Sequence, residues 1–223
     1  MHLPLLLFPR ICPACERTLL SGEESLCTAC QSRLPLTGFS GTPLNLAEQR
    51  LLGRIPFDAA SAYLHFDAAD VSRDTVHNIK YHGNIRLAHA LGQCMGRDLL
   101  QSDRFGILDA IVPVPLHRRR EHHRGFNQSE ALARGMADIM HLPVLTRHLV
   151  RIRNTPSQTL LPHDQRLANV QSAFAIRRSK ALQGRHLLLV DDVLTTGATL
   201  EACAQALLTV PDVTLSIATL SIA

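Results

Sequence analysis

Residues 187–200 read Leu-Leu-Leu-Val-Asp-Asp-Val-Leu-Thr-Thr-Gly-Ala-Thr-Leu, and this segment indicates the fold class of the chain. Its first four residues are all apolar, which is typical of a central parallel strand buried on both faces. Such a strand would carry Asp191 and Asp192 at its C-terminal end, where open α/β sheets bind their ligands. From Leu200 onward, apolar residues recur at the spacing of one helical face. The segment therefore predicts a strand, a turn and a helix.

The turn between this strand and helix contains residue types that suit an anion. Gly197 allows the backbone to approach an anion closely. The hydroxyl and N–H groups around it would lie at a helix N-terminus, which is a common phosphate-binding site. A carboxylate pair that can bind a diol or a metal thus precedes a phosphate cradle, and ribose 5-phosphate would satisfy both. The alternative is an ordinary strand–turn–helix unit, in which a buried carboxylate pair without partners would be costly. A P-loop is disfavoured because its glycine–lysine motif is absent from the chain.

Leu189–Thr199 resembles the phosphoribosyl pyrophosphate (PRPP) motif of type I phosphoribosyltransferases. The resemblance implies that the acidic pair holds the ribose hydroxyls, directly or through Mg²⁺, and that the following loop wraps the 5-phosphate. The residues implied to bind PRPP are Asp191, Asp192, Thr195, Thr196, Gly197, Ala198 and Thr199.

Length and composition set limits on the class of protein. The 223 residues suffice for one α/β domain and a small appendage, and the 46% hydrophobic content can build a core. A net charge of +4 suits anionic ligands but is too small to establish nucleic-acid binding. The apolar N-terminus is short, has no basic region and lacks a small-residue cleavage site, and no stretch approaches the ~18 apolar residues of a membrane span. We therefore expect a cytoplasmic protein without membrane insertion, in which thiols are favoured over disulfides.

Two C-x-x-C pairs stand near the N-terminus. Cys12 and Cys15 form the first pair, and Cys27 and Cys30 the second. Each pair can offer two thiolates to one ion, so together they predict a tetrahedral zinc site, which four protein ligands would make structural. Disulfides are the alternative, and a redox role would need only one pair beside a βαβ unit. The two other thiols, Cys94 and Cys203, are expected as small buried hydrophobes.

The segment around Pro113 predicts a second ligand-binding element. Asp109–Pro115 reads as a strand that should end at Pro113, and four arginines follow within the eight residues 117–124. Such a density of arginine attracts anions. In phosphoribosyltransferases the loop after the equivalent strand grips pyrophosphate, which favours that role here over nucleic-acid contact or simple solvation. The residues assigned to this pyrophosphate loop are Val114, Pro115, Leu116, His117 and Arg118.

The remaining elements can be placed in order along the chain. Residues 1–57 are expected to form the zinc knuckle and a connector with a short helix at 46–52, and residues 58–223 the main domain. The expected strands lie at 60–66, 144–145 and 213–218, and the expected helices at 70–80, from 84 with Asn84 as its cap, and from 129. Lys80–Gly83 could approach a phosphate or be a solvated helix end. The long polar segment 151–174 could be a lid over PRPP or a surface hairpin, and its lid residues would be Arg153, Gln158 and Arg166.

Taken together, the motifs resemble the ComF family of bacteria. The matching segments are the paired C-x-x-C, Lys80–Gly83, Val112–Pro115, Arg124–Gln128, Gln158, Arg166, Asn169–Val170 and Asp191–Thr199. The resemblance implies a type I phosphoribosyltransferase-like α/β fold, an open and mainly parallel sheet flanked by helices, with a four-cysteine zinc knuckle. It also implies an association with natural competence and with the use of extracellular DNA as a nutrient.

The resemblance does not settle a reaction, because a fold can be kept for binding alone. One interpretation is a phosphoribosyltransferase in which a nitrogen nucleophile displaces pyrophosphate from Mg²⁺-bound PRPP, although no general base stands out. The other is a non-catalytic module that binds single-stranded DNA or a protein of the competence machinery.

Overall fold

The computed structural model describes residues 10–66, 84–117, 125–152 and 173–223. Several predictions lie outside these described residues. They are the helix at 70–80, the Lys80–Gly83 motif, Arg118 and the following arginines, the lid residues Arg153, Gln158 and Arg166, and Asn169–Val170.

The centre of the molecule is a four-stranded sheet, and every neighbouring pair of its strands is parallel. Its strand order is β1 (Ala60–His65), β6 (Thr214–Ile222), β5 (His186–Leu194) and β2 (Ala110–Pro113). Parallel neighbours need crossover connections, and these contain the helices α5 (Ile85–Leu100), α7 (Gln128–Met140) and α9 (Ala198–Leu207). The predicted α/β class with a parallel sheet flanked by helices is confirmed.

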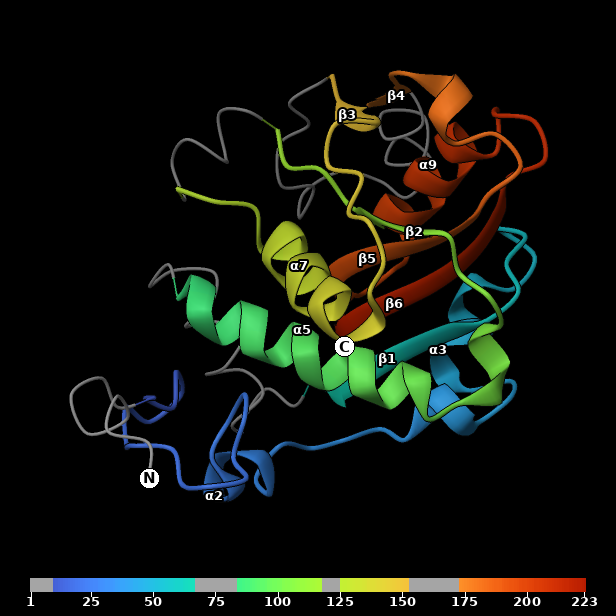
Figure 1. Cartoon of the computed structure of the whole chain (residues 1–223). Coiled ribbons are helices and arrows are strands. Elements are labelled where there is room, and N and C mark those ends of the chain that lie inside the picture. The colour runs from blue at the N-terminus through green and yellow to red at the C-terminus, as the bar shows by residue number, and fades with distance from the viewer. Residues whose placement is uncertain (1–9, 67–83, 118–124, 153–172) are drawn as a thin grey trace, which may run out of the picture.

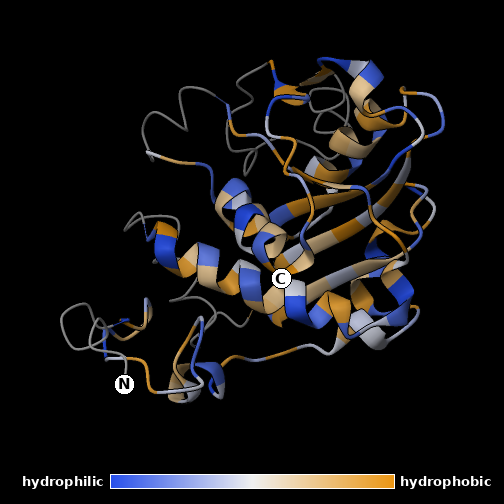
Figure 2. Ribbon diagram, in the orientation of Figure 1, coloured by the Kyte–Doolittle hydropathy of each residue, from blue (hydrophilic) through white to orange (hydrophobic). Residues whose placement is uncertain are grey.

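Helices cover both faces of this sheet (Figure 1). Leu188 and Val190 of β5 pack in the core that contains α5 and α7, whereas Leu187 and Leu189 pack in the core that contains α9 and the short helix α3 (Leu46–Leu51). All four side chains are buried, which explains the unbroken apolar run, because a strand covered on both faces needs no polar alternation. In Figure 2 the strands of the sheet are coloured largely as hydrophobic.

Helices α5 and α7 approach each other unusually closely, and glycine makes this possible. A Cβ atom on Gly92 would lie 2.1 Å from the carbonyl oxygen of Leu132, and one on Gly135 would lie 2.0 Å from that of His89. The N-caps of both helices are asparagines: the predicted cap Asn84 accepts from the N–H of Leu87. The close contact fixes where the N-terminus of α7 lies relative to the sheet.

The predicted bounds of the strands agree with the structure in part. The strand β5 continues past the predicted Val190 to Leu194, because its pairing with β6 extends to the end of both strands. The strand β2 ends at Pro113 as predicted, opposite Val190. The short strand expected at 144–145 is reduced to one parallel bridge between Val144 and Ile111.

Short elements surround the sheet. The strands β3 (Leu149–Arg151) and β4 (Phe174–Ile176) pair antiparallel and pack near α9. One helical turn, α2 (Thr28–Gln31), carries the second cysteine pair. The 3₁₀ turns are η1 (Phe39–Gly41), η2 (Asp103–Phe105) and η3 (Ser179–Ala181). Within the described residues, no helix has the length and apolarity needed to cross a membrane.

The cysteine-bearing segment packs against α5. The Asn84 side chain donates to the carbonyl oxygen of Pro13 at 2.8 Å, and the Ser25 hydroxyl donates to Gln93 at 2.6 Å. Cys27 is part of the core formed with α5. The short helix expected in the connector is confirmed as α3, and its Leu51 packs in the other core. The domain boundary at residue 57 stays a prediction.

Candidate functional site

The four predicted cysteine ligands lie together. Their sulfur atoms are all within 4.8 Å of one another, and the Sγ atoms of Cys15 and Cys27 are 3.6 Å apart. A tetrahedral zinc ion with Zn–S bonds of about 2.3 Å needs sulfur atoms roughly 3.8 Å apart. All six cysteines lie in the described ranges and none is in a disulfide. The donor set therefore fits a metal such as zinc, and Cys94 and Cys203 are buried as expected.

Glu23 links the segment that follows the first cysteine pair to Thr28, which follows Cys27. Its carboxylate accepts from the backbone N–H groups of Leu20 (2.8 Å) and Thr28 (2.7 Å), from the Thr28 hydroxyl (2.9 Å), and from Arg17 (2.5 Å). These hydrogen bonds, led by the two backbone N–H groups, lower the pKa of Glu23 to about 2. Burial opposes ionisation of Cys27, but hydrogen bonds from Arg17 and from the Cys30 N–H lower its pKa to about 6. Sequence reasoning missed Glu23, since an isolated glutamate carries no motif.

The acidic pair stands where β2 stops pairing with β5. The ladder between these strands ends at Val190, so beyond it only β6 remains beside Asp191. Asp191 is 9% exposed, and its Oδ1 accepts from the Ser129 hydroxyl at 2.9 Å and from the N–H of Asp192 at 2.9 Å. Ser129 lies in the first turn of α7, so the packing of α7 on α5 orients the carboxylate. Asp192 is half-buried.

The threonine-lined loop after β5 turns into α9 through Gly197. This residue has φ +79° and occupies the N-cap position of α9. A Cβ atom there would lie 2.9 Å from Cδ2 of Leu51 and 3.1 Å from a guanidinium nitrogen of Arg54, both ends of side chains that can move, so the left-handed conformation is what requires glycine. Thr195 and Thr196 are exposed, and Ala198 and Thr199 are half-buried. The first N–H groups of α9 point out of the helix end, as in any helix, beside these hydroxyl groups.

Two arginines from the α3 region hold this loop by its carbonyl oxygens. Arg50 donates to the carbonyl oxygen of Thr195 at 2.9 Å, and Arg54 donates to that of Thr196. Arg54 also pairs with the buried Glu201 at 2.5 Å. The arginines therefore bind the loop through its carbonyl oxygens and not through its N–H groups. No local sequence pattern marks these two arginines, because more than 140 residues separate them from the loop.

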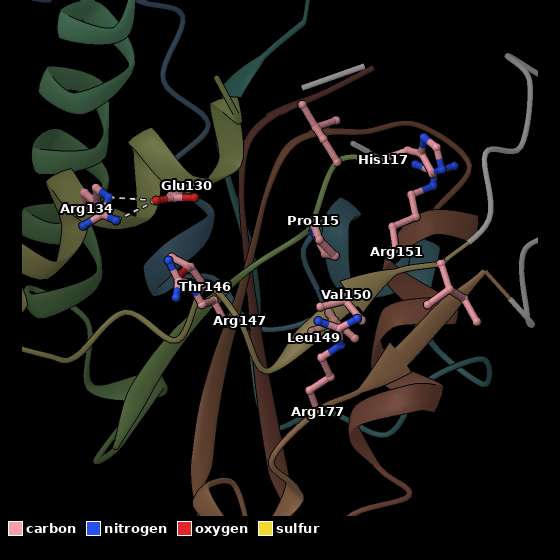
Figure 3. A pocket seen from close by; sticks show the side chains of 12 residues that line it. Pro115, His117, Glu130, Arg134, Thr146, Arg147, Leu149, Val150, Arg151 and Arg177 are labelled. Carbon is pink, nitrogen blue, oxygen red and sulfur yellow. Dashed lines mark hydrogen bonds and ion pairs between the residues drawn. The ribbon is translucent and has the colours of Figure 1, made fainter. Parts of the chain in front are cut away.

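The residues expected in the pyrophosphate loop divide into two groups. Val114 is buried, and its N–H donates to the carbonyl oxygen of Val190, so it continues the sheet. Pro115, Leu116 and His117 line a cavity of about 820 Å³ (Figure 3). The other lining residues are Glu130, Arg134, Thr146, Arg147, Leu149, Val150, Arg151, Ile152 and Arg177. The acidic pair and the threonine loop are not part of this lining.

The buried thiol of Cys203 is influenced by charges of both the acidic pair and the cavity wall. Burial raises the pKa of Cys203 on α9 well above its ordinary value, the Asp191 carboxylate raises it further, and the Arg151 guanidinium lowers it. Both charges therefore act at the same position in the core. The N–H of Val114, which precedes the cavity-lining Pro115, donates to the carbonyl oxygen of Val190, which precedes Asp191, so the cavity and the acidic pair lie at the same end of the sheet.

No family model matches the chain. A crystal structure of adenine phosphoribosyltransferase is similar with a TM-score of 0.41 and 12% identity, covering 65% of this chain and 73% of that one. Since this TM-score is low, the fold class rests on the parallel strand order, the flanking helices and the cysteine cluster.

Sequence relatives are far more similar. The DNA utilization protein YhgH of Escherichia coli (strain K12) is 31% identical over 214 residues, which cover 92% of this chain and 93% of the relative. Competence protein F of Haemophilus influenzae is 27% identical over 207 residues, covering 88% and 90%. The similarity extends over nearly the full length of each protein. The chain therefore belongs to the ComF family, and it combines a parallel sheet flanked by helices with a four-cysteine cluster.

Proposed function

We propose that this protein binds PRPP or ribose 5-phosphate together with Mg²⁺, in the cytoplasm, and serves natural competence or the use of extracellular DNA. The observation that carries the proposal is the acidic pair at the C-terminal half of β5, followed at once by the left-handed Gly197 turn that opens α9. The names of the relatives support the biological association.

In this proposal Asp191 and Asp192 orient the ribose. Ser129 fixes the rotamer of Asp191 through its 2.9 Å hydrogen bond, so the carboxylate is positioned before the ligand arrives. The loop from Thr195 to Thr199 receives the 5-phosphate with its hydroxyl groups and with the N–H groups that begin α9. Arg50 and Arg54 keep this loop in shape without touching the ligand.

The acidic pair fits a magnesium ion by its chemistry. Mg²⁺ prefers carboxylate oxygens, and it is usually held by one or two carboxylates together with phosphate oxygens of the substrate. Asp191 and Asp192 are the residues that would hold it. When bound, the ion would neutralise charge on the pyrophosphate. In this proposal His117 lies beside the pyrophosphate. The cysteine cluster is a separate, structural zinc site, because four protein ligands leave no open position on the ion.

A second candidate is a non-catalytic module that binds single-stranded DNA or a competence protein. The names of the relatives favour it, because they refer to DNA utilization and competence and not to a reaction. Incubation with Mg·PRPP and a mixture of bases and amines separates the two. Acceptor-dependent pyrophosphate release supports transfer, whereas oligonucleotide binding with a steep salt dependence and no release supports the module.

Ligand binding is tested by titration calorimetry of the zinc-loaded chain with ribose 5-phosphate and with PRPP, each with and without Mg²⁺. The double variant Asp191→Asn with Asp192→Asn should lose PRPP binding. Asp109→Asn is the matched control, since Asp109 is an exposed acid just before β2, at the other end of the sheet. Equal PRPP affinity of the wild type and the double variant would refute the proposal.

A further inference from the structure

Two of the four cysteine ligands lie in the core, where water cannot stabilise a charge. Cys12 and Cys27 are both 0% exposed, whereas Cys15 is exposed and Cys30 is half-buried. Zinc is bound by the thiolate form of cysteine, and a buried thiolate is costly unless it is paired or hydrogen-bonded. The two buried sulfur atoms therefore need donors from neighbouring residues.

Backbone N–H groups supply part of that need. The N–H of Cys27 donates to the Sγ atom of Cys12 at 3.4 Å, and the N–H of Cys30 donates to the Sγ atom of Cys27 at 3.3 Å. These donors are dipoles and carry no net charge. Four thiolates around one Zn²⁺ leave a net negative charge on the complex, so a cation beside a buried sulfur atom would stabilise the complex further.

Arg17 places a cation at one of these sulfur atoms. Its side chain donates a hydrogen bond to Cys27, and electrostatic attraction to Cys27 and Cys15 adds to this contact. The carbonyl oxygen of Arg17 also accepts from the N–H of Cys12 at 2.8 Å. Arg17 therefore bonds to a ligand of each cysteine pair, to one through its backbone and to the other through its side chain.

Glu23 fixes the position of the Arg17 side chain. The carboxylate of Glu23 lies 2.5 Å from the Arg17 guanidinium, and it also accepts from the N–H groups of Leu20 and Thr28. Since Thr28 follows Cys27 directly, the carboxylate holds the guanidinium beside the sulfur atom that it contacts. A guanidinium has five N–H groups, enough for both partners. The position of the Arg17 side chain is therefore set by contacts other than those to the cysteines.

We propose that Arg17, held by Glu23, is a positioning residue of the zinc site: its guanidinium donates to the Cys27 thiolate of the metal-loaded knuckle and offsets the negative charge of the four-thiolate complex. Outer contacts of this kind orient a ligand and tune its donor strength, and their loss typically lowers metal affinity by about 10–100-fold. Lysine would keep the charge but lacks the planar fork that bonds to two partners at once. The inference concerns the knuckle alone and does not depend on the proposed phosphoribosyl ligand.

The test measures the zinc affinity of the full chain by competition with a chromophoric chelator. Arg17→Gln should lower the affinity about 10–100-fold, and Arg17→Lys, which keeps the charge without the forked contact, should recover part of that loss. Arg86→Gln is the matched control, because it removes the same charge from an exposed residue of α5 that lines a cavity together with Cys12 and Cys15. It should change the affinity less than about twofold, since charges that interact through solvent are largely screened.

Cobalt gives a second readout, which a purely structural role of Arg17 would not produce. In the Co²⁺-loaded chain, loss of a hydrogen bond to a coordinating sulfur atom makes that atom a stronger electron donor. The sulfur-to-cobalt charge-transfer band of Arg17→Gln should therefore move to longer wavelength, while the d–d bands that report tetrahedral geometry stay as in the wild type. Arg86→Gln should leave both sets of bands unchanged.

Four results would overturn the inference. The first is a wild-type chain that binds no zinc, and the second is an unchanged zinc affinity in Arg17→Gln. The third is an equal loss of affinity in Arg17→Gln and Arg86→Gln, which would assign the effect to the general electrostatic field. The fourth is loss of the tetrahedral cobalt bands in Arg17→Gln with no recovery in Arg17→Lys, which would make Arg17 a residue needed only to fold the knuckle.

Discussion

Replacing Gly92 with alanine tests the contact that positions α7, and hence Ser129, against the sheet. The new Cβ atom would lie 2.1 Å from the carbonyl oxygen of Leu132, whereas ordinary contact begins at 3.4 Å, so the helices must part by roughly 1.3 Å. The obstacle is backbone and cannot rotate away. The same shift would stretch the 2.9 Å hydrogen bond from Ser129 to Asp191.

The expected loss of stability follows from two opposing effects. Overpacking of a tight core costs about 1–3 kcal/mol, and a backbone obstacle places Gly92→Ala near the upper end. Alanine regains about 1 kcal/mol through its higher helix propensity. The net destabilisation is therefore about 2 kcal/mol, which corresponds to a fall in Tm of about 4–8 °C for a domain of this size.

Gly96→Ala is the control on the same helix. Its Cβ atom would lie 3.2 Å from the nearest atoms of Met136, a distance that a small adjustment relieves, so propensity and crowding should nearly cancel. Urea unfolding of both variants, monitored by circular dichroism, gives the comparison. If Gly92→Ala is as stable as Gly96→Ala, the helices do not approach as closely as described, and the reasoning fails.

Three further predictions follow from the knuckle and the loop. Cys12→Ser with Cys15→Ser should abolish binding of about one zinc per chain, measured by elemental analysis, and lower the Tm, because the knuckle packs on α5; fully folded, metal-free wild type would contradict this. Glu23, with a pKa of about 2 against an ordinary 4.5, stabilises the fold above pH 4.5 and loses this contribution as the pH falls toward 2, so Glu23→Gln should flatten that part of the stability profile; parallel profiles would exclude the role. Gly197→Ala should cost roughly 1–3 kcal/mol of stability and weaken ribose 5-phosphate binding, since φ +79° is strained for a residue with a side chain; unchanged unfolding and affinity would refute it.

The sequence predicted the elements that local patterns determine. The apolar run at 187–190 gave the central strand, Asn84 marked the start of α5, and the spacing of the cysteines indicated their cluster. The predicted end of the strand at Val190 was wrong, because pairing with β6 extends β5 to Leu194. The acidic residues that follow Val190 carry no sequence signal of this pairing.

The parts that could not be predicted depend on contacts between distant segments. Arg50 and Arg54 hold a loop more than 140 residues away, and no local pattern marks them. Gly92 reads as an unfavourable helix residue until Leu132 is seen beside it. The arginines of the cavity are likewise spread over several elements, so their convergence appears only in three dimensions. The PRPP-binding roles of residues 191–199 stay predictions.

The central claim is that the acids of β5 and the loop that opens α9 form one phosphoribosyl site. The most direct measurement is a crystal structure of the zinc-loaded protein with Mg²⁺ and PRPP. We expect density for the ribose hydroxyls at Asp191 and Asp192 and for the 5-phosphate at residues 195–199. Well-ordered crystals grown at saturating PRPP with no ligand density at these residues would contradict the claim.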